Sequence, residues 1–239
     1  MTETIKDAVV LITGASGTIA QALIAALTAR GVKKIYAAAR NTSGLAASEL
    51  IVPIKMDVTS DNDVAKAASM ATDVTLLINN AGVNHNTAFM LAPDMAIARE
   101  EIEANYLAPL RVTRAFAPAL IANSGAVLNL LTILARVNLP FMGSYCASKA
   151  AALSLTQGLR GELVPKGVRV VAAMPGAVDT RMTAVLTIPK MTPADAAAEI
   201  LNGFEAGEEE IYVGDMARSL AQGLAHDPKA VERQLASPG

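Results

Sequence analysis

Short apolar runs alternate with longer amphipathic stretches along almost the whole chain. Runs rich in Val, Ile, Leu and Ala predict buried strands at residues 8–12, 33–39, 50–54, 74–78, 125–131, 167–173 and 211–213. Helical spacing of apolar positions predicts helices ending near residue 29, at 61–72, around 94–122, from about 145 to 164, near 193–206 and at the C-terminus. Strands that alternate with helices indicate a parallel sheet with right-handed crossovers. We therefore predict a single α/β domain, residues 1–239, with a doubly wound parallel sheet of about seven strands flanked by helices.

Composition excludes several classes of protein. The net charge is −2 over 239 residues, which gives no reason to expect nucleic acid or an anionic membrane as a partner. No apolar run approaches the ~20 residues that cross a bilayer, and we expect no secretory signal. The single cysteine, Cys146, excludes an internal disulfide, and His85 and His226 do not form metal-ligand spacing with it. We expect a cytoplasmic protein without a bound metal.

The first predicted strand leads into a turn that contains two glycines and is followed by a helix. This arrangement points backbone N–H groups and a helix N-terminus toward a phosphate. An ordinary tight turn would carry the same glycines, so the turn alone leaves both interpretations open. As a dinucleotide site, it would bind through Gly14, Ser16, Gly17, Thr18 and Ile19.

The end of the second strand bears on the choice of cofactor. In dinucleotide-binding folds this position meets the adenosine ribose, where a carboxylate binds the 2′-hydroxyl of NAD. The chain has Ala39-Arg40-Asn41 there, so no carboxylate is available and a guanidinium can pair with a 2′-phosphate. This favours NADP(H) over NAD(H), although a solvated arginine at a strand end would look the same.

Tyr145 and Lys149 are the candidates for proton transfer. Four residues apart on a helix, they lie on one face, where a fixed ammonium would lower the pKa of the phenol and let it exchange protons near neutral pH. An amphipathic helix with a core tyrosine and a solvated lysine has the same spacing, so the pair alone decides nothing. Asn105 stands within a predicted helix, where an asparagine caps, bends or serves a site.

These motifs follow one another in a specific order at the predicted strand ends. They are Thr13-Gly14, Asp57, Asn79-Asn80-Ala81-Gly82, Asn105, Tyr145-x-x-x-Lys149, Pro175-Gly176 and Thr180. In this order the chain resembles the short-chain dehydrogenase/reductase family over nearly its whole length. The resemblance implies a Rossmann-like fold and NAD(P)-dependent hydride transfer between a carbonyl and an alcohol.

The resemblance also assigns roles to individual residues. Tyr145 would be the general acid and base, Lys149 would lower its pKa and bind the nicotinamide ribose, and Asn105 would hold a water of the proton relay. The other cofactor contacts would come from Asp57 and Val58 at the adenine, Asn80, Ala81 and Gly82 at the ribose, and Pro175, Gly176, Val178 and Thr180 around the nicotinamide.

Two positions depart from the family pattern. Thr132 stands where the family usually has serine; threonine keeps the hydroxyl that can orient a substrate oxygen, and its methyl group stiffens the side chain. In the glycine turn, Thr18 and Ala20 replace the later glycines, and Gly17 comes one place early. We retain Asn105, Thr132, Tyr145 and Lys149 as the predicted catalytic set, and we expect the altered turn to change cofactor affinity.

The residues expected around the substrate are mostly apolar. They are His85, Leu134, Phe141, Met142, Met182 and Leu186, with Ile133, Leu139 and Val185 beside them. We therefore predict an NADP(H)-dependent oxidoreductase acting on an apolar ketone or aldehyde as its small-molecule substrate. The alternative is a protein of the same fold that binds a dinucleotide as a sensor or scaffold without turnover. Small residues in helices 106–122 and 145–164 favour a homo-oligomer, and we expect a tetramer.

Overall fold

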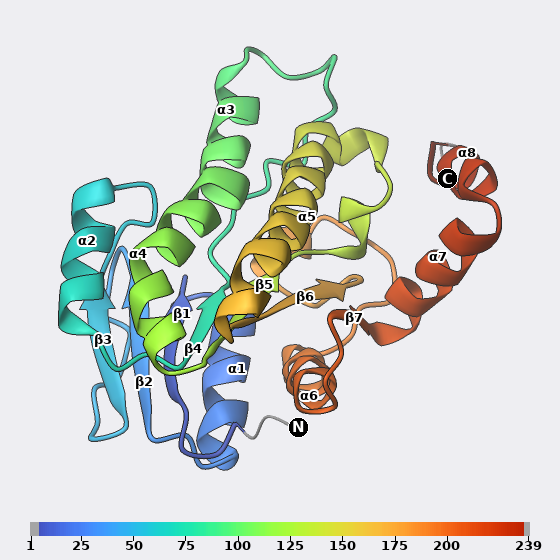
Figure 1. Ribbon diagram of the computed structural model, residues 1–239. Helices are drawn as coiled ribbons and strands as arrows, with labels where there is room; N and C mark the ends of the chain where they lie inside the picture. The colour runs from blue at the N-terminus through green and yellow to red at the C-terminus, as the bar shows by residue number, and fades with distance from the viewer. Residues whose placement is uncertain (1–4, 237–239) are drawn as a thin grey trace.

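The computed structural model of the chain describes residues 5–236, and its centre is a parallel sheet of seven strands (Figure 1). The spatial order of the strands is β3-β2-β1-β4-β5-β6-β7. Their bounds are β1 (Val9–Thr13), β2 (Lys34–Ala39), β3 (Ile51–Lys55), β4 (Leu76–Asn79), β5 (Ala126–Leu130), β6 (Arg169–Pro175) and β7 (Glu210–Val213). All neighbouring strands run parallel. The predicted fold class and all seven predicted strands are confirmed.

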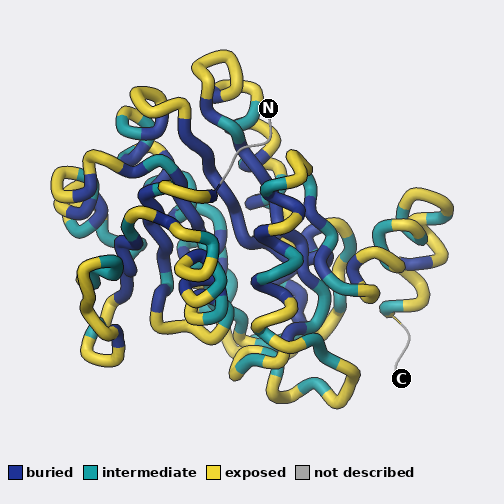
Figure 2. Tube along the Cα trace, turned by 90° about the horizontal axis from the view of Figure 1, so that it is seen from below, coloured by how far each residue is buried: buried dark blue, intermediate teal, exposed yellow. Residues whose placement is uncertain are grey.

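Helices cover both faces of this sheet. On one face are α1 (Thr18–Ala29) and α6 (Pro193–Glu205); on the other are α2 (Asp61–Met70), α4 (Ala108–Ala122) and α5 (Gly143–Leu163). The strands alternate their side chains between the two layers, so that Val10 and Ile12 of β1 join one apolar core and Val9 and Leu11 join the other. Figure 2 shows the buried strands in the interior and the exposed positions concentrated in the loops and outer helix faces.

The helix predicted around residues 94–122 is interrupted in the middle. It consists of α3 (Ala96–Ile102), a π-helical turn η1 (Glu103–Leu107) and α4. Asn105 lies in the centre of η1 and uses its side chain to bond the segment after β4. Single π-turns inside helices occur frequently at functional sites. The structure therefore gives Asn105 a place in a π-turn within the helix, together with contacts to a neighbouring loop.

The C-terminal region contains two helices where the sequence predicted one. They are α7 (Gly214–His226) and α8 (Pro228–Ala236), and the break falls at Pro228, which has no N–H to continue the helix. The two helices pack on each other and extend away from the sheet beside β7 (Figure 1). The start of α7 lies against the end of β6. A Cβ added to Gly176, which follows β6, would be only 3.0 Å from the Cβ of Met216 in α7. Within residues 5–236, no helix is both long and apolar enough to cross a membrane.

Candidate active site

The carboxyl ends of four strands bring the predicted site residues to one edge of the sheet. Gly14 follows β1, Asn80 follows β4, Thr132 lies just beyond β5 and Gly176 follows β6. In open parallel sheets, ligands bind outside this edge, near the point where the strand order reverses. Here the reversal lies between β1 and β4. The structure therefore gathers residues that are far apart in the sequence where a dinucleotide would be expected to bind.

The glycine turn has the backbone that phosphate binding requires. Gly14 has a φ of 64°, in the left-handed region that favours glycine, and a Cβ there would lie 2.9 Å from the Cα of Ala81. Gly17 is the N-cap of α1, and no side chain caps the free N–H groups of the first helical turn. The remaining predicted residues of the turn, Ser16, Thr18 and Ile19, stand at this N-terminus in exposed or half-buried positions. The turn thus offers an uncapped helix N-terminus, which suits a phosphate.

Asn80 braces the glycine turn against the end of β4. Its side-chain amide donates hydrogen bonds to the backbone carbonyl oxygens of Thr13, at 2.9 Å, and Gly14, at 3.3 Å. The backbone N–H groups of Asn80 and Ala81 both donate to Oγ1 of Thr13 at 3.0 Å. These four bonds hold the ends of β1 and β4 in fixed relation, and they give Asn80 a structural role through its side-chain hydrogen bonds.

Arg40 directly follows β2, its side chain is exposed, and its positive charge affects the pKa of Asp57. Two hydrogen bonds from Thr59 hold the pKa of Asp57 below its usual range, and the positive charge of Arg40 lowers it further. Among the described residues, no hydrogen bond or ion pair engages the Arg40 guanidinium, so it is available to an anionic ligand. Val58, next to Asp57, is half-buried, and its carbonyl oxygen accepts a hydrogen bond from Arg111 at 3.1 Å.

Tyr145 and Lys149 project from α5 into the protein interior. Only 8% of Tyr145 and 6% of Lys149 is exposed, so the alternative of a solvated lysine is wrong. The Lys149 ammonium donates to the backbone carbonyl oxygen of Leu130 at 2.9 Å and lies 6.0 Å from the centre of the Tyr145 ring. The Tyr145 hydroxyl makes no hydrogen bond with residues 5–236. In this part of the chain every fully buried polar side-chain atom has a hydrogen-bond partner, so the hydroxyl is not fully buried. It therefore remains accessible to a small ligand.

Burial controls the protonation of this pair. It lowers the pKa of Lys149 to about 8. Burial raises the pKa of Tyr145 above its usual value, and electrostatic interactions with Cys146 and Glu101 raise it further. The sequence predicted a lowered pKa for Tyr145, and this prediction is wrong for the present arrangement, because Lys149 points to Leu130 and desolvation of the phenolate dominates. Tyr145 is consequently protonated at neutral pH.

Asn105 links the π-turn to the helix that carries the tyrosine. Its Oδ1 accepts a hydrogen bond from the N–H of Val83 at 2.9 Å, and its Nδ2 donates to the Val83 carbonyl at 2.8 Å and to Oγ of Ser148 at 2.9 Å. Ser148 in turn donates to the backbone carbonyl of Tyr145 at 2.7 Å. Sequence reasoning missed Ser148, which is fully buried; in the sequence its one signal is its place between Tyr145 and Lys149.

Gly82 allows the loop after β4 to approach Asn105 and Lys149 closely. A Cβ at this position would lie 2.8 Å from Oδ1 of Asn105 and 3.5 Å from Nζ of Lys149. The first distance is shorter than real Cβ contacts, so any larger residue would displace the Asn105 amide. The predicted ribose-lining segment therefore lies directly beside the predicted proton relay.

Thr132 joins the ends of β5 and β6. Its buried hydroxyl donates to the backbone carbonyl of Pro175 at 3.3 Å and accepts from the N–H of Leu134 at 3.3 Å, at the start of the 3₁₀ turn η2 (Ile133–Ala135). Thr180 caps a second 3₁₀ turn, η5 (Arg181–Thr183), and Val178 is buried in a β-bridge with Met191. The segment after β6 is thus held on both sides of Pro175-Gly176.

The predicted substrate residues divide by exposure. Met142 is buried with Tyr145 and Cys146, and Leu134 and Leu186 pack against the same apolar cluster. This cluster forms a hydrophobic wall around the tyrosine ring.

Three other predicted substrate residues lie nearer the surface. Phe141 is 42% exposed and Met182 is 36% exposed. The ring of His85 is directed to Glu100, with 3.0 Å between Nε2 and Oε2. The structure therefore places the His85 ring in contact with the exposed Glu100 side chain, and the apolar contacts with Tyr145 come from Met142, Leu134 and Leu186 instead.

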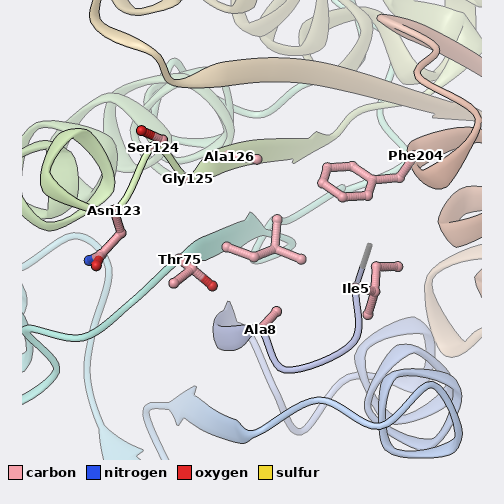
Figure 3. A pocket seen from close by; sticks show the side chains of 9 residues that line it. Ile5, Ala8, Thr75, Asn123, Ser124, Gly125, Ala126 and Phe204 are labelled. Carbon is pink, nitrogen blue, oxygen red and sulfur yellow. The ribbon is translucent and has the colours of Figure 1, made fainter. Parts of the chain in front are cut away.

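A cavity of about 160 Å³ lies at the opposite edge of the sheet. Its walls include residues that precede β1, β4 and β5, namely Ala8, Thr75 and Gly125, together with Phe204 of α6 (Figure 3). None of its nine lining residues titrates, and none belongs to the predicted site. The described His, Cys, Asp and Glu side chains also form no group that could hold a metal.

The chain is similar to known proteins of one enzyme family. A family model described as short chain dehydrogenase matches residues 8–190. The short-chain dehydrogenase ptmH of Penicillium ochrochloron is 37% identical over 180 residues, which cover 72% of this chain and 66% of that relative. The chain therefore spans just under two thirds of the length of ptmH. The ketoacyl reductase HetN of a Nostoc species is 28% identical over 230 residues, covering 88% of this chain and 79% of the relative.

A solved structure gives a more complete match. It is the crystal structure of a short-chain dehydrogenase from Burkholderia cenocepacia in complex with NADP. The two proteins are 44% identical, and the alignment covers 99% of this chain and 100% of the other with a TM-score of 0.95.

Proposed function

Because the chain belongs to the short-chain dehydrogenase family, we propose that it is an NADP(H)-dependent oxidoreductase that interconverts an apolar carbonyl compound and its alcohol. The observation that carries the proposal is the position of Tyr145. Its hydroxyl has no hydrogen-bond partner among residues 5–236, and its ring packs in the apolar cluster. Lys149 lies one helical turn further along α5. Asn105 donates to Ser148, which in turn donates to the backbone carbonyl of Tyr145. A pure dinucleotide-binding protein has no use for this arrangement.

Tyr145 acts as the proton donor in carbonyl reduction. The bound nicotinamide cofactor supplies the hydride. As the carbonyl carbon accepts the hydride, the Tyr145 hydroxyl gives its proton to the carbonyl oxygen, which yields the alcohol and leaves a phenolate that regains a proton from solvent. In alcohol oxidation the phenolate accepts the hydroxyl proton. The raised pKa of Tyr145 keeps the phenol protonated at neutral pH, which suits the donor role.

The neighbouring side chains support this transfer. Lys149, whose pKa is about 8, carries a positive charge at pH 7 and stabilises the phenolate that forms on proton transfer. The Thr132 hydroxyl, which donates to the Pro175 carbonyl in this structure, turns its proton to the substrate oxygen and orients it; a serine at this position keeps the same hydrogen-bonding capacity. Asn105 holds the helix bend and the loop after β4 together, so that the proton path beside Lys149 keeps its geometry.

The cofactor preference is for NADP(H). The turn at Gly14 and Gly17 presents a close backbone approach and an uncapped helix N-terminus to the phosphates. Arg40, exposed at the end of β2 with no carboxylate on its own strand end, pairs with the 2′-phosphate. The Burkholderia relative in complex with NADP supports this assignment.

The substrate is an apolar ketone or aldehyde, and β-ketoacyl compounds belong to this class. The apolar cluster around Tyr145 favours a hydrophobic group beside the carbonyl. The name of the relative HetN, a ketoacyl reductase, supports the inclusion of ketoacyl substrates.

The functional unit is a homotetramer of one-domain subunits in the cytoplasm. On the outer side of α5, Gly158 and Gly161 are exposed and a Cβ on either would meet nothing within 4 Å. Exposed Ala147 and Ala150 lie on the same helix. Small residues permit close helix packing between subunits. Light scattering should give a mass near four times 24.7 kDa at micromolar concentration, and a monomer would contradict the assembly.

A substrate panel tests the activity directly. Apolar ketones, aldehydes and β-ketoacyl thioesters are offered with NADPH and NADH, and the corresponding alcohols with NADP and NAD, while the nicotinamide absorbance is followed. We expect turnover with NADPH on at least one apolar carbonyl. Binding of NADPH without turnover on any member of a broad panel would favour the sensor or scaffold alternative.

A further inference from the structure

Glu101 is a buried carboxylate that the proposed reaction does not use. It lies on α3, one helical turn before Asn105, and only 1% of it is exposed. None of the ion pairs in the described part of the chain includes Glu101. A carboxylate without a cationic partner is expensive to bury unless hydrogen bonds satisfy its oxygens. Its presence beside a catalytic helix therefore calls for a specific set of contacts.

Both oxygens of Glu101 accept a hydrogen bond. Oε1 accepts from the backbone N–H of His85 at 2.8 Å, and Oε2 accepts from Oγ of Ser144 at 2.5 Å. His85 belongs to the loop after β4, which carries Gly82. Ser144 belongs to the first turn of α5, immediately before Tyr145. One carboxylate thus joins the helix of the π-turn, the cofactor-side loop and the catalytic helix.

The charge of Glu101 also meets the start of α5 favourably. No side chain caps this helix end and no acidic residue lies in its first turn, so the partial positive charge of the helix N-terminus has no anion from α5 itself. The Glu101 carboxylate supplies one from α3, bonded to the first helical turn through Ser144. This interaction, together with the two hydrogen bonds, offsets the desolvation of the buried charge.

The same charge acts on the proton donor. Around Tyr145, the titratable groups are Lys149 and Cys146 on α5 and Glu101 on α3, and the His85 ring is paired with Glu100. After burial and Cys146, Glu101 is the third contributor that raises the pKa of Tyr145, whereas burial is the cause of the lowered pKa of Lys149. The charge of Glu101 therefore adds to the effect of burial on the tyrosine.

We propose that Glu101 is a positioning residue for the reaction: its carboxylate holds the loop after β4 against the first turn of α5, and its buried charge lies at the start of the helix that carries Tyr145. The inference deepens the proposed function and rests on it, because Tyr145 must be the proton donor for its protonation to matter. Both oxygens of Glu101 are engaged by His85 and Ser144, so its effect passes through these hydrogen bonds and through its charge.

Glu101→Gln tests the charge while keeping the shape of the side chain. The amide oxygen can still accept from His85, and the Ser144 hydroxyl can rotate to accept from the amide. With the negative charge gone, more Tyr145 is deprotonated at a given alkaline pH. We expect alcohol oxidation at alkaline pH to rise about threefold and its pH profile to move about half a unit toward lower pH, while reduction at pH 7 changes less.

Glu100→Gln is the matched control. Glu100 is the adjacent carboxylate, its side chain is 59% exposed, and it pairs with the ring of His85. Solvent screens such a charge, so its removal should leave the pH profile in place. Equal shifts in Glu100→Gln and Glu101→Gln, or no shift in either, would contradict the role of the Glu101 charge.

Two further variants test the tether. Glu101→Asp keeps the charge on a shorter side chain, so the pH profile should stay near that of the wild type while hydrogen exchange in residues 83–87 speeds up. Should Glu101→Gln fail to fold, Ser144→Ala removes one of the two hydrogen bonds from the other side and should also speed exchange in residues 83–87. Unchanged exchange in both Glu101→Asp and Ser144→Ala would rule out the tether.

These measurements separate this inference from the proposed function. If the wild type turns over no carbonyl, the proposed function fails, but the hydrogen-exchange result still decides whether Glu101 tethers the loop. The effect of the Glu101 charge can then be measured as the titration of Tyr145, followed by the ultraviolet absorbance of tyrosinate. The contribution of Tyr145 is the difference between the absorbance of Glu101→Gln and that of Glu101→Gln/Tyr145→Phe. Earlier titration of Tyr145 than in the wild-type background supports the inference, and identical titration contradicts it.

Discussion

The two sides of the candidate site present different chemical groups: mainly backbone on one side and buried side chains on the other. On the side of β1 and β2, the contacts open to a dinucleotide are the backbone of the turn at Gly14 and Gly17 and one exposed cation, Arg40. On the side of α3 and α5, the proposed chemistry depends on buried polar side chains such as Tyr145 and Lys149. Backbone recognition tolerates changes in most side chains, whereas a buried titratable group responds to every charge around it. Substitutions on the two sides should therefore change different measured quantities, cofactor affinity on the first side and turnover on the second.

The largest expected effect is on the catalytic side. Tyr145→Phe removes one hydroxyl that has no protein partner in the described structure, so folding and NADPH binding should be retained. Loss of the general acid should lower turnover by at least ~100-fold. Steady-state kinetics with NADPH and fluorescence titration of the cofactor measure the two quantities. Turnover within threefold of the wild type would show that another group donates the proton.

Arg40→Ala breaks the cofactor side without touching the catalytic side. A charge-assisted contact between guanidinium and phosphate contributes about 1.5–3 kcal/mol, so NADPH should bind about ten- to a hundredfold more weakly. NADH has no 2′-phosphate, and its dissociation constant should hardly change. The NADPH effect should shrink as salt screens the pair. Equal losses for both cofactors would assign Arg40 a purely structural role.

Gly14→Ala should reduce stability and cofactor affinity together. Alanine in the left-handed region costs about 1–2 kcal/mol, and its Cβ would also press on the Cα of Ala81 at 2.9 Å. Gly167→Ala is the matched control, because Gly167 has a φ of 80° but its Cβ would meet nothing closer than 3.5 Å. Denaturant unfolding should show a larger loss for Gly14→Ala, and NADPH binding should weaken only in that variant. The turn is not the phosphate site if both variants bind NADPH as the wild type does.

The smallest expected effect is a gain in stability. Burial lowers the pKa of Lys149 from 10.5 to about 8, so below pH 8 the folded protein holds a buried charge at a disadvantage of about 3 kcal/mol. Lys149→Met removes this charge and also the hydrogen bond to Leu130, which was worth about 2 kcal/mol. The variant should therefore be about 1 kcal/mol more stable at pH 7 and should lose turnover.

The pH dependence gives this prediction its control. Between pH 8 and pH 10.5 the unfolded chain binds a proton at Lys149 that the folded protein has released, so the wild type gains stability as pH rises through this window. Lys149→Met lacks this gain. Unfolding measured at pH 7 and at pH 9.5 should therefore show the advantage of the variant shrinking at the higher pH. A difference that stays constant would mean that Lys149 is not a buried charge.

The elements that the sequence predicted well are those with a local signal. The seven strands follow from apolar runs, and the start of α2 follows from Ser60, whose side chain accepts from the N–H of Asp63. The glycine turn and the Tyr-to-Lys pair were found because their residues are close in sequence. The exact path of the helix around Asn105 was not, because the π-turn depends on bonds to Val83, which is 22 residues away.

Non-local contacts also explain what the sequence misjudged at the site. The spacing of Tyr145 and Lys149 places them on one face, but it does not say that the ammonium turns to Leu130 or that burial outweighs its charge. Glu101 offered no signal at all, since a glutamate in a helix is ordinarily solvated. Its burial depends on donors from His85 and Ser144, which come from two other segments. Protonation in this site is a property of the assembled fold.

The strand order has a consequence for how the protein is made. The strands β3-β2-β1-β4 come from residues 9–79, and β5-β6-β7 come from residues 126–213, so the sheet is two contiguous halves of the chain joined along β4 and β5. During synthesis the first half emerges complete, braced by Thr13 and Asn80, while the partner of β4 has yet to appear. Until β5 arrives, Leu76, Leu77 and Ile78 form an open apolar edge to which another nascent chain can pair. The yield of soluble protein should therefore depend on how quickly the second half is translated and docked.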